Sequence, residues 1–320
     1  MERMDANALL FTWVESPITP KQLSEINSSL GRVQFGAALT ESDHKKLAEW
    51  LRKFPDVSLR VYESFGAPER DLDFLRHYKG LKRLSVDLYH LQSLDGLYHI
   101  ADSLEYFGFG QTKEKVSVEF LAEFGRLKGL ALDGHELGIE AISNLKKMEE
   151  LTLRSITLPD LEIIANLPKL WSLDLILGGT KNLAALARIR SLKNLELCLV
   201  KKLSDISVLS AVTSLQRVKL HSLRNVTAIP DLCKLKKLRR VSFQNMKGIK
   251  DLSALLGAKS LEDICITQGS QLQPEAFQPL QKHPSLKAIG FGLGSDKKNQ
   301  AVAAMFPQLQ HTIKYPFVYR

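Results

Sequence analysis

The sequence predicts an α/β solenoid, a curved stack of repeats whose strands form a concave parallel sheet with short helices or 3₁₀ turns on the convex side. An apolar pattern, L-x-x-L-x-L, recurs at intervals of 21 to 27 residues through most of the chain. Within each copy, apolar and polar residues alternate as in a strand with one buried face. Too few residues separate the copies for a long helix. The copies begin at Leu30, Phe54, Leu81, Leu104, Leu127, Met148, Leu170, Leu192, Leu215, Leu238, Leu261 and Leu286.

Residues 1–29 are predicted to cap the first repeat. A solenoid leaves its apolar core open at both ends, so each end needs a cover. The apolar stretch 8–14 and a helix that begins after Pro20 can supply one.

The first repeats are longer, and their outer side is predicted to be helical. The run Thr40-Glu41-Ser42-Asp43 is typical of a helix start. Leu47, Trp50 and Leu51 then recur at helical spacing. Residues 68–75 predict a second short helix, and the outer side of the later repeats should be flatter.

The repeat that starts at Leu192 shows how the later repeats are expected to fold. Leu195 and Leu197 alternate with less apolar neighbours, and residues 205–209 bring apolar side chains inward again before the next strand. About twelve such repeats are predicted to fill residues 30–310. Residues 311–320 are predicted to add a last strand that shields the final repeat.

The phrase Leu203-Ser204-Asp205-Ile206-Ser207-Val208-Leu209 resembles the repeats of leucine-rich-repeat proteins. The similarity is greatest to the internalin-like and phosphatase-regulator type. It implies a leucine-rich-repeat solenoid, shaped as a horseshoe or arc, with protein ligands. One feature departs from the family, whose usual asparagine at the ninth position is replaced by Val200, Leu223 and Met246. We expect apolar packing to take over from the hydrogen bonds of that asparagine.

The concave face of the strands between Met148 and Phe243 is the predicted binding surface. Asp174 and Glu196 should lie side by side at about 4.8 Å, with Lys219 next to Glu196. Basic groups of a partner would suit the acidic-mixed half, Glu150, Arg154, Asp174 and Glu196. Acidic groups would suit the basic half, Arg217, Lys219, His221 and Arg240. Equally, these charges could serve only to keep the sheet soluble. The predicted protein-binding residues are Glu150, Arg154, Asp174, Glu196, Arg217, Lys219, His221 and Arg240.

Positive charge is concentrated in residues 181–260. This stretch holds 17 of the 44 Lys and Arg residues but only 4 of the 35 Asp and Glu residues. Such a region could attract nucleic acid, acidic lipid or an acidic protein surface. Its only aromatic residue, Phe243, falls at a core position, which disfavours base stacking. Our first hypothesis is therefore a non-catalytic scaffold or regulator that binds a protein, and the rival is a binder of an anionic polymer or membrane surface.

Catalysis has one candidate pair in this sequence. Cys198 and His221 occupy equivalent positions in consecutive repeats, as a nucleophile and its base could. An open sheet offers no pocket and no oxyanion donors, and further metal ligands are missing. We therefore expect no enzyme activity, no metal and no cofactor. The three cysteines, and the lack of an export signal or a membrane-spanning run, predict a cytoplasmic protein. We also expect it to be a monomer.

Overall fold

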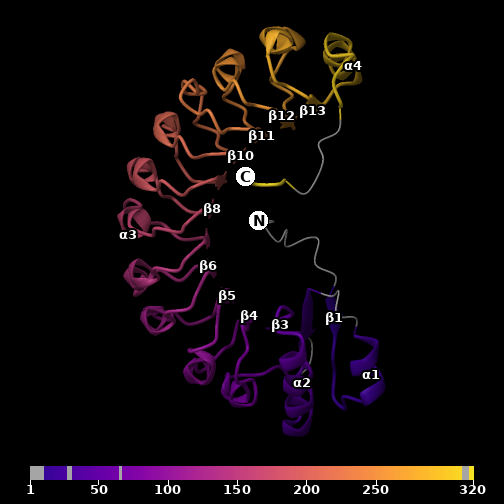
Figure 1. The fold of residues 1–320 in the computed structure, drawn as a ribbon, viewed down its shortest axis with the longest axis vertical. Coiled ribbons are helices and arrows are strands. Elements are labelled where there is room, and N and C mark those ends of the chain that lie inside the picture. Colours follow the sequence, from indigo (N-terminus) through magenta and orange to yellow (C-terminus); the bar gives the residue numbers. More distant parts are fainter. Residues whose placement is uncertain (1–10, 27–30, 65–66, 312–316) are drawn as a thin grey trace. The chain divides into compact units, whose positions relative to one another are not determined.

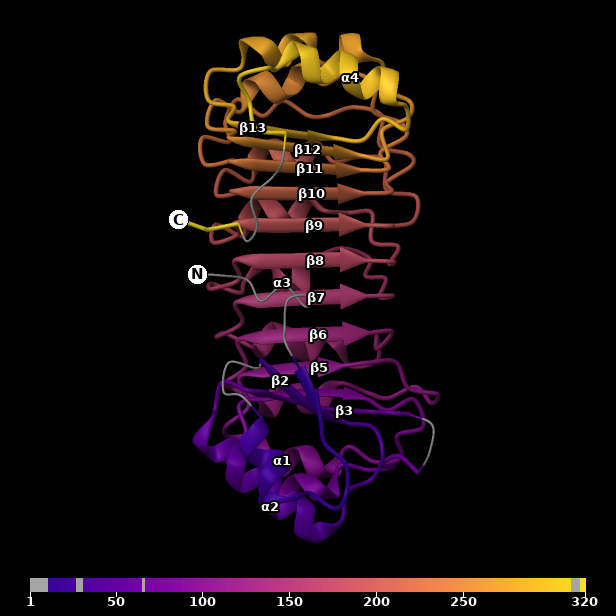
Figure 2. The ribbon, with the colours of Figure 1, turned by 90° about the vertical axis from the view of Figure 1, so that its right-hand side faces the viewer.

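The computed structural model describes residues 11–26, 31–64, 67–311 and 317–320. Contacts divide the chain into two compact units on either side of the Glu149–Glu150 bond. In both units the strands are parallel and follow one another in chain order (Figure 1, Figure 2). Helical turns lie on one side of the sheet and leave the other side, the open face, without helices (Figure 1). Both units thus have the architecture of a leucine-rich-repeat solenoid.

The unit before Glu150 begins with a strand that the repeat pattern did not include. Strand β1 pairs with β2, so part of the predicted cap extends the sheet. Helix α1 starts at Pro20 and α2 follows Thr40, whose hydroxyl accepts the Asp43 N–H as the predicted N-cap. The elements are β1 (Phe11–Trp13), α1 (Pro20–Glu25), β2 (Arg32–Phe35), α2 (Glu41–Lys53), β3 (Ser58–Tyr62), β4 (Arg83–Asp87), β5 (Tyr106–Phe109) and β6 (Gly129–Asp133), with 3₁₀ helices at Asp73–His77, Asp95–Ile100, Glu119–Glu123 and Ile139–Asn144.

Two sequence predictions in this unit were wrong in detail. The second early helix is a 3₁₀ helix at Asp73–His77, because residues 68–72 form only an irregular connection and bends. The pattern that appeared to begin at Phe54 begins two residues later, since Ser58 pairs with Arg32 in the sheet. Phe54 is the C-cap of α2, and its ring packs on Trp50 with centroids 4.5 Å apart.

The unit from Glu150 onwards follows the sequence pattern closely. In every copy of the pattern from Leu81 to Leu286, the strand starts at the third residue. The elements are β7 (Glu150–Arg154), α3 (Glu162–Ala165), β8 (Ser172–Ile176), β9 (Asn194–Cys198), β10 (Arg217–His221), β11 (Arg240–Gln244), β12 (Asp263–Thr267), β13 (Ala288–Phe291) and α4 (Asp296–Met305), with 3₁₀ helices at Ala184–Arg188, Ser207–Ala211, Ser253–Gly257 and Pro274–Lys282.

The turn after each strand in this unit is regular despite the missing asparagine. Val200, Leu223 and Met246 are buried, as predicted for apolar packing at the ninth position. The residue directly after each strand from β7 to β12 has a positive φ of 52° to 61°. Its N–H continues the ladder, as where Leu199 donates to the His221 carbonyl at 2.9 Å.

The last residues of the sequence differ from their prediction. Residues 312–316 of the predicted final strand lie outside the described residues. Phe317–Arg320 form no strand, and they lie against the β8–β11 region instead of the final repeat (Figure 2). The helix α4 packs against the 3₁₀ helix Pro274–Lys282 on the outer side of the last repeat.

Candidate functional site: the open face of β7 to β11

All eight predicted binding residues lie on the open face of β7 to β11. Each belongs to the set of strand residues that alternates with the buried leucines, valines and phenylalanines. The register aligns equivalent residues, so that Asp174 pairs with Glu196 and Glu196 pairs with Lys219. The predicted neighbours are therefore neighbours in the structure.

The acidic pair differs from its prediction in exposure. Asp174 is only 2% exposed, and its Oδ2 accepts a hydrogen bond from Thr152 Oγ1 at 3.1 Å. Glu196 forms an ion pair with Lys219 at 2.9 Å, as the spacing predicted. On this face Glu196 and Lys219 are thus partly exposed as an ion pair, whereas Asp174 is buried beside them in the sheet.

In the basic half, Lys219 and Arg240 are paired with carboxylates, while Arg217 is bonded to a neutral amide. Arg240 is 3% exposed, and its guanidinium donates from Nε and Nη2 to Asp263 Oδ2 at 3.0 and 2.7 Å. Arg217 donates from Nη1 to Asn194 Oδ1 at 2.9 Å. Such charge-assisted bonds fix the side chains in one geometry. The face is an ordered polar surface with little net charge of its own.

Cys198 and His221 meet as predicted, with 3.2 Å between Sγ and Nδ1. Burial, and next the charge of Glu196, raise the pKa of the Cys198 thiol. Burial, and next the charge of Lys219, lower the pKa of His221. Both shifts favour the neutral forms near pH 7, whereas a cysteine nucleophile reacts as its thiolate. The electrostatics oppose catalysis by this pair.

The segment Phe317–Arg320 covers part of the same face, at the beginnings of β8 to β11. Phe317, Tyr319 and Trp171, which directly precedes β8, form one buried aromatic cluster. The Trp171 and Tyr319 rings meet edge to face with centroids 4.9 Å apart. The Tyr319 hydroxyl donates to Asn194 Oδ1 at 2.9 Å.

The backbone of this segment is also bonded by side chains. Arg239 Nη1 donates to the Val318 carbonyl at 3.0 Å. The amide of Gln216 bonds both backbone groups of Arg320, accepting its N–H at 2.8 Å and donating to its carbonyl. The segment is thus held by aromatic, hydroxyl and main-chain contacts at once.

Sequence reasoning did not identify Trp171, Gln216 and Tyr319 as parts of this site. Trp171 and Gln216 occupy the second position of their repeats, which the pattern leaves unassigned. The sequence predicted an extended segment at residues 311–320, but Phe317, Val318 and Tyr319 are all apolar and do not indicate which side chains are buried. It could not signal which surface that segment would cover.

A row of basic side chains lies at one edge of the sheet, beyond the ends of β9, β10 and β11. Lys201, Arg224 and Lys247 occupy equivalent positions in three consecutive repeats, and all three are exposed. None of the ion pairs recorded among the described residues includes them. This row is the best-defined part of the positive region at 181–260.

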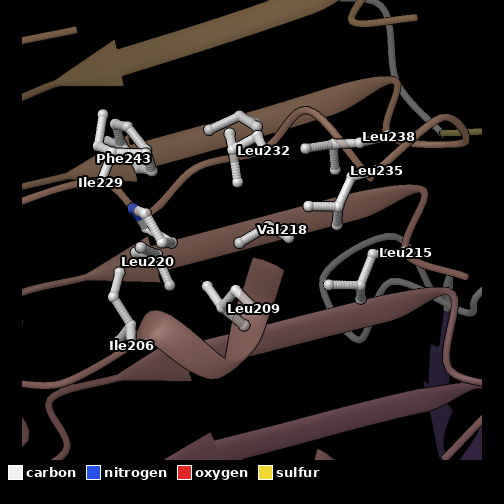
Figure 3. A pocket seen from close by; sticks show the side chains of 12 residues that line it. Ile206, Leu209, Leu215, Val218, Leu220, Ile229, Leu232, Leu235, Leu238 and Phe243 are labelled. Atoms are coloured by element: carbon white, nitrogen blue, oxygen red, sulfur yellow. The ribbon is translucent and has the colours of Figure 1, made fainter. Parts of the chain in front are cut away.

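A small apolar cavity of about 20 Å³ lies in the core beside β10 and β11. Figure 3 shows Leu209, Val218 and Leu232 around it. It lies where the connection between β10 and β11 contains no helical turn. A void of this size is too small for a substrate, and its apolar lining offers no side-chain hydrogen-bond partner to a water molecule.

Neither a metal site nor a membrane span is found in the part of the chain that the structure describes. That part contains no cluster of three or more His, Cys, Asp or Glu side chains suited to a metal ion. None of its helices combines the length and the apolar character needed to cross a bilayer. Its three cysteines are all free.

No protein-family model and no curated protein matches the chain. Among solved structures, an internalin (inlF) from Listeria monocytogenes is similar with a TM-score of 0.44, at 15% identity over 80% of this chain and 86% of the internalin. An internalin C2 (inlC2) from the same organism gives a TM-score of 0.42, at 18% identity over 72% of this chain and 84% of the other. The leucine-rich-repeat architecture itself is established by the repeats and strands described above.

Proposed function

We propose that this protein is a non-catalytic scaffold or regulator that binds another protein through the open face of β7 to β11. The observation that carries the proposal is the ordered row of polar side chains across consecutive strands, held by the Thr152–Asp174, Glu196–Lys219 and Arg217–Asn194 bonds. Preordered side chains lose little entropy when a partner docks, so such a surface favours binding.

The proposed contacts divide into exposed and supporting residues. Glu150, Arg154, Glu196, Lys219 and His221 retain exposed surface. Asp174 and Arg240, which are buried, would act by holding their neighbours in place. Arg217 also remains partly exposed beside Asn194.

We propose a cytoplasmic location, for which the three free cysteines are suited.

Charge reversal at two exposed positions tests this proposal. The double variant Arg154→Glu, Lys219→Glu should lose a protein that the wild type captures from a native lysate, because two complementary contacts become repulsive. The matched control, Lys45→Glu with Arg52→Glu, reverses two exposed charges on α2 and should retain capture. Unchanged capture by the first variant, with an unchanged circular dichroism spectrum, would show that the partner uses another surface.

A second candidate function is supported by the edge row of Lys201, Arg224 and Lys247. Unneutralised cations at the strand spacing of about 4.8 Å could follow a chain of phosphates or a layer of acidic lipid. Binding of single-stranded DNA or of vesicles containing phosphatidylserine should then fall steeply with added salt. This binding should be lost when Lys201, Arg224 and Lys247 are all changed to glutamate. It should be retained when Lys234, Lys236 and Lys237 are changed to glutamate instead. Salt-independent or absent binding would exclude this candidate.

A further inference from the structure

We propose that the surface beneath Phe317–Arg320 is a recognition site for an extended peptide segment of a partner protein with two aromatic residues in alternate positions, and that Phe317–Arg320 is its built-in competitor. This inference deepens the proposed function and rests on it, since it names the chemistry that the open face recognises. We use Phe317–Arg320 as a template, because its contacts with the surface indicate which features a ligand needs.

The side-chain pattern of the template defines the aromatic requirement. Phe317 and Tyr319 face the protein, whereas Val318 between them is 55% exposed. Arg239 and Arg240 each place the guanidinium carbon 4.9 Å from the centre of the Phe317 ring. A cation over an aromatic face is attractive, so an aliphatic residue here would bind less well.

The second aromatic position also selects for a hydroxyl. The Tyr319 ring packs on Trp171, and its hydroxyl bonds to Asn194, which is itself fixed by Ser172 at 2.9 Å. A ligand without the hydroxyl would lose one of the two hydrogen bonds that Asn194 Oδ1 accepts and keep only the one from Arg217 Nη1. Tyrosine therefore suits this position better than phenylalanine.

The backbone contacts make the site general for extended chains. Gln216 bonds the N–H and the carbonyl of one residue, as a neighbouring strand would, and Arg239 bonds the carbonyl of Val318. None of these three contacts depends on the identity of a ligand side chain. Recognition by main-chain bonds with alternate side-chain pockets is a recurring mode of peptide binding.

The built-in segment leaves part of the site unsatisfied. The Trp171 indole N–H is buried and has no hydrogen-bond partner among the described residues. The same holds for Arg217 Nε on the adjacent surface. A partner segment with an acceptor for either donor would gain a contact that Phe317–Arg320 lacks, and could displace it.

Fluorescence anisotropy with a labelled peptide tests the inference on purified protein. The probe is HTIKYPFVYR, the sequence of residues 311–320. The variant Phe317→Ser, Tyr319→Ser should release the covering segment and bind this peptide. A tethered segment acts at an effective concentration on the order of 1 mM, so wild type should bind at least about tenfold more weakly. The same peptide with serine at both aromatic positions is the control ligand and should not bind.

A milder variant keeps the test valid should the double substitution disturb folding. Tyr319→Phe removes only the hydroxyl bond to Asn194 and should bind the probe more tightly than wild type. Adding Gln216→Ala to either variant should weaken the binding. Equal affinity of the variants and wild type, or equal binding of the serine peptide, would overturn the inference. A wild-type dimer that dissociates on Phe317→Ser, Tyr319→Ser would also overturn it, by making a second copy of this chain the occupant.

The test separates this inference from the proposed function, because no partner protein is needed. Peptide binding together with failed capture would leave the recognition site standing and remove the scaffold proposal. If a protein is captured through Arg154 and Lys219 but the peptide does not bind, the scaffold proposal stands and the recognition site is removed.

Discussion

His135 is a buried residue whose protonation should be visible in the stability of the protein. Its ring stacks on Phe109 with centroids 4.1 Å apart, and its Nε2 bonds to the Gly110 carbonyl at 2.9 Å. Burial lowers the pKa of His135, although the bond to Gly110 and the charge of Asp133 oppose this shift. The folded protein therefore favours the neutral ring, while the unfolded chain takes up a proton near pH 6.5.

We predict that His135 makes the protein less stable as the pH falls. The pKa of His135 is lower in the folded than in the unfolded protein, so its contribution to the free energy of unfolding is lost as the pH falls below about 6.5. The free energy of unfolding then falls by at most about 1.4 kcal/mol per pH unit. Urea unfolding of wild type and His135→Gln at pH 7.5, 6.5 and 5.5 measures it, and the variant should show the shallower dependence. The exposed His99→Gln is the control. Equal slopes for His135→Gln and wild type would contradict the prediction.

At this scale the sequence predicted which residues meet, but not which are covered. The Cys198–His221 and Glu196–Lys219 contacts follow from repeats of equal length, because stacking aligns equivalent positions. The burial of Asp174 and Arg240 depends on the groups around and above the strand. A period-two pattern identifies the face of a residue and does not identify what lies over that face.

The turn after each strand from β7 to β12 places a residue other than glycine in the left-handed region. Six consecutive turns require a residue at positive φ, and only Asn245 is of a type that adopts this conformation readily. Its side chain also bonds Ser222 of the preceding turn at 2.7 Å. Leu199 holds the equivalent position one repeat earlier, at φ 54° and 39% exposed.

We predict that Leu199→Asn stabilises the protein by up to about 1 kcal/mol. The left-handed conformation costs a leucine roughly 1–2 kcal/mol, and losing a partly exposed side chain offsets some of the relief. Thermal unfolding measures the change as a higher Tm. Leu137→Asn, at an exposed leucine outside the positive-φ turns, is the matched control and should give no gain. The prediction is contradicted if Leu199→Asn lowers the Tm by as much as the control does.

The strands were predictable from sequence and the outer turns were less so. In most strands, buried apolar side chains occupy alternate positions in the sequence, and this pattern can be detected within five residues. The outer segments must cross between strands in few residues, which favours 3₁₀ turns that carry little periodicity. Residues 205–209 were predicted to turn inward, and Ser207–Ala211 is the 3₁₀ helix that does so.

On the scale of the molecule, almost all contacts between elements join consecutive repeats. In residues 150–320 the paired elements are neighbours in the sequence, as in β11 with β12 and β12 with β13. Phe317–Arg320 is the exception, since the Tyr319–Asn194 bond spans 125 residues. Repeat spacing predicts the contacts between consecutive repeats, because equivalent residues recur at the same position of each repeat. A single contact between distant segments has no periodic signal, and this is why the sequence did not predict it.

Nearest-neighbour contacts also predict how a local loss of stability spreads through the unit from Glu150 onwards. Ile289→Ala removes a fully buried side chain of β13 that pairs with Ile264 of β12, at a cost of about 2–5 kcal/mol. In a linear array this loss should fall off with distance, because each repeat is stabilised only by its neighbours. Hydrogen exchange should show lost protection in β12 and β13, less in β11, and little change in β8 and β9. Leu195→Ala in β9 is the matched control, and its effect should spread equally towards β8 and β10. Equal loss of protection from β7 to β13 in either variant would mean that this unit unfolds as one cooperative globule, with its stability not built from stacked repeats.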